Sequence, residues 1–173
     1  MEESIMGAME DMQKDNVQQE QTADGLAEAV GRVFALPETD AGMYSPLVLA
    51  YIGDGVYELA VRTILVRHGN IQVNKLNTKA TKLVKAEAQA ALIHAIAEDL
   101  TPEEASVYRR GRNAKSYTVA KHATMSDYRH ATGLEALCGY LYLKREYDRM
   151  AELLKLAMDR TGILEGLWDT TSR

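Results

Sequence analysis

The chain has 173 residues, 46% of them hydrophobic, and a formal net charge of −5; this length fits one domain with a sizeable core. Its single cysteine, Cys138, excludes an internal disulfide and a multi-cysteine zinc site, and is typical of a reducing compartment, so we expect a cytoplasmic protein. There is neither a run of about 18 apolar residues nor a basic and then apolar N-terminus, which argues against a membrane span and a signal peptide.

The charge is distributed unevenly along the chain. Residues 1–40 hold ten acidic and two basic residues, whereas residues 41–173 hold 18 basic and 15 acidic residues, a net charge of +3. The first 25 residues are polar, rich in glutamine and free of aromatic side chains, so they bury too little surface to offset the entropy of ordering. We predict a largely disordered acidic extension over residues 1–42, with a short helix over 25–36, and a mildly basic folded domain over residues 43–173.

Beyond residue 43 the apolar residues recur at helical spacing, which predicts an all-α fold. Ser45 and Pro46 are typical of a helix start and predict a very apolar helix over 46–68. In chain order, further helices are expected over 74–99 with a break near the middle, from residue 102 to Gly111, over about 127–144, and from residue 147 to Gly162.

The two most apolar helices, 46–68 and 127–144, each carry one isolated acid. Asp54 lies between two glycines, and Glu135 lies near two more. Glycine inside a helix costs about 1 kcal/mol relative to alanine, so we expect these helices to approach closely, within the apolar core, and to bring the two carboxylates together. At about 5 Å and an effective dielectric of about 20, the two charges repel by roughly 3 kcal/mol.

Two carboxylates without histidine or cysteine partners suit a hard cation such as Mg²⁺. The pattern alone equally allows two ordinary buried acids, each paired with arginine or lysine. Glu58, one turn after Asp54, is expected to pair with Arg62. The four histidines show no metal-ligand spacing; His94 is expected to lie in the core, and Cys138 to be inert packing.

A basic segment lies between Glu104 and Asp127, where no acid occurs. A flexible, glycine-containing loop of this composition predicts a clamp for phosphate groups, although a solvated charged loop has the same composition. A second, weaker basic feature is a lysine face on the helix before it, where three lysines are spaced i, i+4, i+7. The candidate RNA-binding residues are Arg109, Arg110, Arg112, Asn113, Lys115 and Ser116 in the segment, and Lys75, Lys79 and Lys82 on the helix.

Several motifs in order resemble one family. "LAYIGDGVYE" and "HATGLEALCGYLYL" resemble the two signature helices of the ribonuclease III domain, and "NTKATKLVKAEAQAALI" with "RRGRNAKS" is similar to its compact bacterial branch, Mini-ribonuclease III. The resemblance covers about residues 43–168. It implies a compact helical bundle and a homodimeric, Mg²⁺-dependent endonuclease that cleaves double-stranded RNA and matures the 23S ribosomal RNA precursor.

The resemblance also implies the roles of site residues. Asp54 and Glu135 occupy the positions of the catalytic and metal-binding acids. Where full-length members have two further acids this chain has Leu47 and Thr132, as the Mini-ribonuclease III branch does, which leaves the number of metal ions open.

No separate double-stranded-RNA-binding domain is expected, so the catalytic domain itself must hold the RNA. A ribosomal protein or a pre-50S particle is a further candidate partner. The main alternative is a non-catalytic RNA-binding or ribosome-assembly protein on the same fold, which has lost activity with two of the four acids. A third is a helical interaction module in which both acids are structural.

Overall fold

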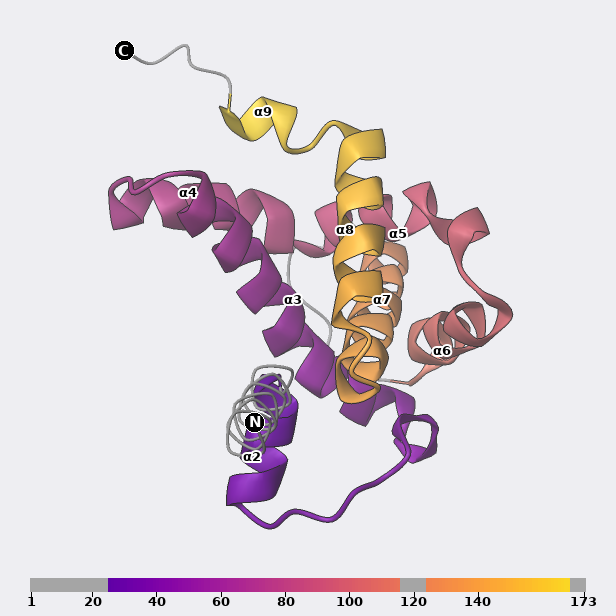
Figure 1. Ribbon diagram of the computed structural model, residues 1–173. Coiled ribbons are helices and arrows are strands. Elements are labelled where there is room, and N and C mark those ends of the chain that lie inside the picture. The colour runs from indigo at the N-terminus through magenta and orange to yellow at the C-terminus, as the bar shows by residue number, and fades with distance from the viewer. Residues whose placement is uncertain (1–24, 116–123, 169–173) are drawn as a thin grey trace, which may run out of the picture. The chain divides into compact units, whose positions relative to one another are not determined.

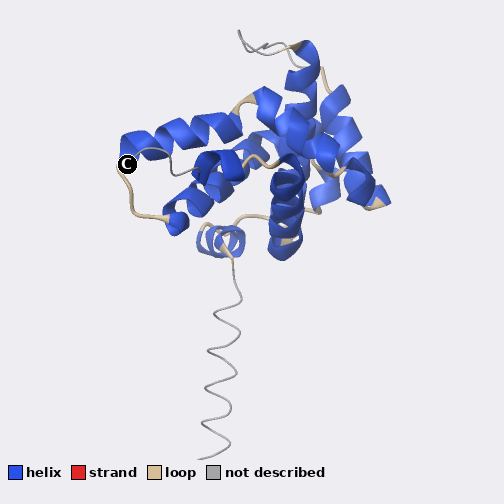
Figure 2. Ribbon diagram, turned by 90° about the horizontal axis from the view of Figure 1, so that it is seen from above, coloured by secondary structure: helices blue, strands red, loops and turns tan. Residues whose placement is uncertain are grey.

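The computed structural model of the chain describes residues 25–115 and 124–168. All regular elements within these residues are helices, and no strand occurs among them (Figure 2), which confirms the all-α prediction. In the same residues no helix has the length and apolar character needed to cross a membrane.

The chain divides into two compact units, Met1–Thr39 and Asp40–Arg173. The described part of the first unit contains α2 (Leu26–Val33), the short helix expected over 25–36. Of residues 1–42, which were predicted to be largely disordered, residues 1–24 lie outside the described part of the chain, and for them the disorder stays a prediction. All other elements belong to the second unit.

The second unit is a bundle of helices (Figure 1). Its elements, in chain order, are η1 (Ala41–Met43), α3 (Pro46–His68), α4 (Val73–Val84), α5 (Ala86–Ala95), η2 (Ala97–Asp99), α6 (Pro102–Asn113), α7 (Met125–Leu143), α8 (Tyr147–Thr161) and α9 (Glu165–Trp168).

Local signals set most of the helix ends. The Ser45 hydroxyl accepts the Val48 N–H at 3.4 Å and caps α3, which has the predicted bounds. Thr101 and Glu104 cap α6 reciprocally, with each side chain accepting from the other's backbone N–H. Lys85, in extended conformation, forms the predicted break between α4 and α5. These ends therefore follow from side chains close in sequence.

The end predicted for α6 is wrong. The helix continues to Asn113, and Gly111 is buried inside it rather than at its end. A Cβ atom at Gly111 would lie 2.7 Å from the Cβ of Ala136, so this glycine lets α6 approach α7. The residues 109–113 are consequently helical, and the prediction of a flexible basic loop is wrong for them.

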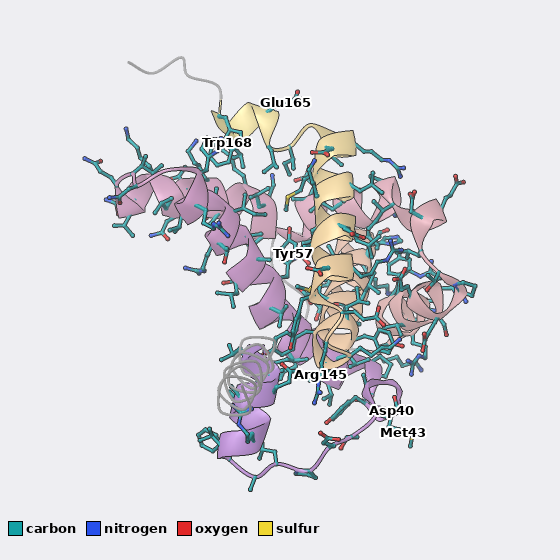
Figure 3. The ribbon with its side chains drawn as sticks, viewed as in Figure 1. Asp40, Met43, Tyr57, Arg145, Glu165 and Trp168 are labelled. Carbon is teal, nitrogen blue, oxygen red and sulfur yellow. The ribbon has the colours of Figure 1, made fainter. Side chains whose placement is uncertain are left out.

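Helix α7 is the centre of the unit and contacts α3, α5, α6 and α8. The side chains that are most fully buried come largely from α3 and α7, and Tyr57 of α3 is completely buried in the bundle (Figure 3). Its hydroxyl donates to the Leu83 carbonyl at 2.8 Å, close to the end of α4. The core thus joins the end of α4 to the middle of α3.

Two glycines allow α3 and α7 to cross closely. A Cβ atom at Gly53 would lie 1.7 Å from the Glu135 carbonyl oxygen, and one at Gly139 would lie 2.0 Å from the Leu49 carbonyl oxygen. The predicted close approach is confirmed at these positions. It is wrong for Gly55, where a Cβ atom would meet nothing within 4 Å, because this residue faces away from α7.

Candidate active site

The α3–α7 crossing brings Asp54 and Glu135 together. Burial and then the charge of Asp54 are the main causes that raise the pKa of Glu135 from 4.5 to about 7. Burial, followed by the charge of Glu58, raises the pKa of Asp54. Glu135 is half-buried, but Asp54 is exposed in the single chain, so the expectation that both acids lie within the core is wrong for Asp54. The pair lies at the edge of the core, with Asp54 on the solvent side.

Neither acid of this pair forms an ion pair with another described residue, which counts against the alternative of two structural salt bridges. Glu58, by contrast, pairs with Arg62 at 3.0 Å, as predicted. Asp54 and Glu135 are therefore two acidic groups without a cationic partner within the described part of the chain.

A third polar group, Gln89 of α5, contacts Glu135. Its side chain is 3% exposed, and its Nε2 donates to the Val84 carbonyl at 3.0 Å and to Glu135 Oε1 at 3.3 Å. The hydrogen bond to Glu135 partly offsets the rise in the pKa of that carboxyl group. Sequence reasoning missed Gln89; the signal was a lone amide within the apolar run "AEAQAALI".

The groups present fit a hydrated Mg²⁺ ion. Mg²⁺ prefers oxygen ligands, keeps several waters, and is often held by only one or two protein carboxylates. Among the described residues no cluster of three or more histidine, cysteine, aspartate or glutamate side chains occurs, so a closed protein cage is not available there. Two carboxyl groups whose charges repel each other, one of them in contact with an amide whose buried oxygen lacks a donor from the described residues, form a matching oxygen-rich site.

Leu47 and Thr132, the two positions at which the resemblance to ribonuclease III implies acids in full-length members, contribute no carboxylate here. Leu47 is 41% exposed on α3. Thr132 is buried on α7, one turn before Glu135, and its hydroxyl donates to the Tyr128 carbonyl at 3.0 Å. The hydroxyl is thereby engaged within its own helix.

Cys138 and the described histidines lie outside this site. Cys138 is buried, and burial raises the pKa of its thiol to about 12, which confirms inert packing. His94 is exposed rather than in the core, and its Nε2 lies 3.3 Å from that of His130. Tyr108 in turn contacts His130 Nδ1.

The basic end of α6 presents several cations to solvent. Arg109, Arg110 and Lys115 are exposed, whereas Arg112 is half-buried, with its guanidinium carbon 5.6 Å from the Tyr108 ring centre. Arg112 Nε also donates to the exposed Asn113 Oδ1 at 3.2 Å. Ser116, the remaining candidate of this segment, lies outside the described residues.

The three lysines of α4 face a cavity of about 610 Å³. Lys75 and Lys82 are exposed. Lys79 is half-buried; its ammonium donates to the Leu167 carbonyl and lies 5.1 Å from the Trp168 ring centre, beside α4 (Figure 3). No acidic residue is among those that line the cavity. The prediction that the three lysines share one face of the helix is therefore confirmed. Lys79 in addition contacts two residues of α9.

The sequence profile of the Ribonuclease III domain matches residues 47–146. The chain is 48% identical to Mini-ribonuclease 3 of Clostridium tetani over 69% of this chain and 80% of that protein. It is 39% identical to Mini-ribonuclease 3 of Streptococcus pneumoniae over 70% of this chain and 96% of that protein. A crystal structure of a Fusobacterium nucleatum protein superposes with a TM-score of 0.65 and 28% identity, covering 74% of this chain and 97% of that one.

Proposed function

The chain belongs to the ribonuclease III family and is an endoribonuclease, and we propose that Asp54 and Glu135 form its active site and that it depends on Mg²⁺ to cleave double-stranded RNA. The observation that carries the proposal is the pair itself: at the close α3–α7 crossing the charge of Asp54 acts on Glu135, and neither acid forms an ion pair with another described residue. Such a pair is poised to hold a cation.

In this proposal Asp54 and Glu135 bind the ion from adjacent helices. When bound, Mg²⁺ favours ionisation of a water nucleophile and stabilises the negative charge that builds on the phosphate. Glu135 must first lose its proton, since its pKa is about 7 without metal. The water oxygen bonds to phosphorus, the bond between phosphorus and O3′ breaks, and the leaving oxygen gains a proton. The products carry a 5′-phosphate and a 3′-hydroxyl.

The exposed cations support a surface that holds RNA by its phosphates. A-form RNA presents phosphates and 2′-hydroxyls rather than readable base edges, so duplexes are recognised mainly by shape and charge. We propose that the α6 cations and Asn113 contact one part of the duplex backbone and the α4 lysines another. The acid-free lining of the α4 cavity supports this role. Ser116 remains a candidate from the sequence.

An apolar stripe on α3 supports the homodimer that is typical of the family. Four apolar side chains of α3 at helical spacing are exposed: Val48, Tyr51, Leu59 and Val66. Gly55 lies on the same face, with open space in front of it. We propose that a second copy of the chain covers this stripe, which places one active site at each strand of a duplex.

The finer substrate assignment rests on the likeness to Mini-ribonuclease III. We propose that the RNA is the 23S ribosomal RNA precursor in the cytoplasm, and that a ribosomal protein or the pre-50S particle presents it. Incubating the protein with naked precursor and with isolated pre-50S particles would test this. Equal cleavage of unrelated duplexes at the same rate would argue against a dedicated precursor substrate.

Cleavage of an end-labelled RNA duplex, with Mg²⁺ or with EDTA, tests the catalytic proposal. Asp54→Asn should keep the fold and RNA binding but lose cleavage. Glu58→Gln, one turn further along α3, is the matched control and should cleave within a few-fold of the unsubstituted chain. Mg²⁺-dependent cleavage by Asp54→Asn would exclude the assigned role. If the unsubstituted chain binds duplex but gives no 5′-phosphate products under any condition, the non-catalytic alternative holds.

A further inference from the structure

Gln89 connects three elements at the proposed metal site. It lies on α5 with 3% of its surface exposed, and its amide nitrogen bridges the Val84 carbonyl of α4 and the Glu135 carboxylate of α7. Val84 is the last residue of α4, so its carbonyl has no partner within the helix and needs a donor from elsewhere. One amide group therefore caps α4 and touches the carboxylate.

These contacts fix which way the amide points. Both N–H groups of Gln89 are used, one by each acceptor. Exchanging the oxygen and nitrogen would place the amide oxygen against a carbonyl oxygen and a carboxylate oxygen, two contacts between acceptors. The nitrogen must consequently face Glu135, and an N–H bond to a carboxylate favours its ionised form and fixes its direction.

The same orientation leaves the amide oxygen without a donor. Gln89 Oε1 is shielded from solvent and has no hydrogen-bond partner among the described residues; it is the one side-chain atom there of which both are true. Buried polar atoms in folded proteins are rarely left in this state, so an orphan acceptor on an amide group that touches Glu135 points to a bound donor. A hydrated cation brings such donors, because Mg²⁺ retains several of its waters.

We propose that Gln89 is a positioning residue of the metal site. Its nitrogen holds the Glu135 carboxylate in the direction that receives the ion, and its oxygen accepts a hydrogen bond from a water of the hydration shell. This inference rests on the proposed metal site of Asp54 and Glu135. It gives the site a third oxygen, from α5, in a chain that has Leu47 and Thr132 where other family members have acids.

The test measures Mn²⁺ binding to the full chain without RNA, by the electron paramagnetic resonance of free Mn²⁺. Gln89→Leu keeps the volume and removes both polar atoms. It should weaken Mn²⁺ binding by about 10- to 100-fold, the usual effect of removing a residue that orients a metal ligand. Duplex cleavage should then need more Mg²⁺ for half-maximal rate, while the rate at saturating Mg²⁺ falls much less.

Tyr57→Phe is the matched control for loosening the end of α4. It removes a buried donor from the Leu83 carbonyl, the neighbour of the one that Gln89 caps, and leaves the Gln89–Glu135 contact in place. This variant should lose stability but keep the Mn²⁺ affinity of the unsubstituted chain. Gln89→Met, unbranched and of similar length, repeats the test if the leucine variant does not fold.

The outcomes separate the two levels of the proposal. If Asp54→Asn loses Mn²⁺ binding while both Gln89 variants match the unsubstituted chain, the metal site stands and the role of Gln89 is refuted. If Tyr57→Phe weakens Mn²⁺ binding as much as Gln89→Leu does, the effect belongs to the helix end and the role is likewise refuted. If the unsubstituted chain binds no Mn²⁺, the proposed metal site itself fails.

Discussion

Replacing Glu135 with glutamine should make the metal-free protein more stable while abolishing cleavage. The pKa of Glu135 is raised from 4.5 to about 7, chiefly by burial and then by the charge of Asp54. Below pH 4.5 Glu135 is protonated, and therefore uncharged, in both the folded and the unfolded chain. In that range it does not make the free energy of unfolding depend on pH. Between pH 4.5 and 7 the unfolded chain releases the proton and the folded chain keeps it, so folding stability falls as pH rises.

The size of the effect follows from the shift. Each pKa unit corresponds to about 1.4 kcal/mol, so the loss approaches about 3 kcal/mol above pH 7 as an upper bound. Glutamine has a similar shape, carries no charge, and its oxygen still accepts the N–H of Gln89. The Glu135→Gln variant should therefore keep most of the free energy of unfolding that the unsubstituted chain loses as pH rises.

Urea unfolding in EDTA at pH 5 and pH 8 measures the difference. The free energy of unfolding of Glu135→Gln should exceed that of the unsubstituted chain slightly at pH 5 and by up to about 3 kcal/mol at pH 8. Adding Mg²⁺ should narrow the gap, because an ion that binds only the folded carboxylates stabilises the unsubstituted chain. A gap that stays constant between the two pH values, or a variant that is less stable at pH 8, would refute the reasoning.

Further substitutions probe the helix crossing, the apolar stripe and the basic surface. Gly53→Ala should destabilise the fold by about 3 kcal/mol or more in urea unfolding, because its Cβ would overlap the Glu135 carbonyl, whereas Gly55→Ala meets open space and should be neutral or gain up to about 1 kcal/mol in the monomer. Tyr51, the most exposed residue of the stripe at 84%, should be needed for the dimer: Tyr51→Glu should sediment as a monomer in analytical ultracentrifugation, and an unchanged dimer would reject the stripe as the interface. Arg110→Ala should weaken duplex binding and lower the slope of log affinity against log salt by about 1, whereas an unchanged slope would mean that this side chain is merely solvated.

The helices were predictable because their ends are set locally. Ser45 and Pro46 begin α3 at the predicted residue, and Gly162, with φ of 64°, ends α8. The glycine roles were harder to predict. Gly53 and Gly55 flank the same aspartate, yet only Gly53 touches α7, since residues two apart on a helix face in different directions. Gly111 has the sequence signature of a helix end, because the sequence does not reveal that Ala136 packs against it.

The two acids of the site were predictable because each is isolated in an apolar helix. Gln89 was not, because its role depends on contacts that span 46 residues of sequence to Glu135. The exposure of Asp54 was also not predictable from the sequence pattern. A helix that is apolar on nearly every side is predicted to be fully buried. One side of α3, however, has no partner within the described chain, and the apolar residues on that side form the exposed stripe.

The position of Asp54 beside that stripe links assembly to catalysis. On α3, Asp54 lies next to the face that carries Tyr51, Gly55 and Leu59, so a second copy seated there would displace water around Asp54. Removing water strengthens the repulsion between Asp54 and Glu135, and thereby the gain when a cation binds between them. In the proposed dimer, metal binding and association must then favour each other to the same extent, since coupling between two binding equilibria is reciprocal. This coupling raises the cation affinity of a site that has only two carboxylates. Desolvation in the dimer then provides part of the affinity that additional acids would otherwise provide.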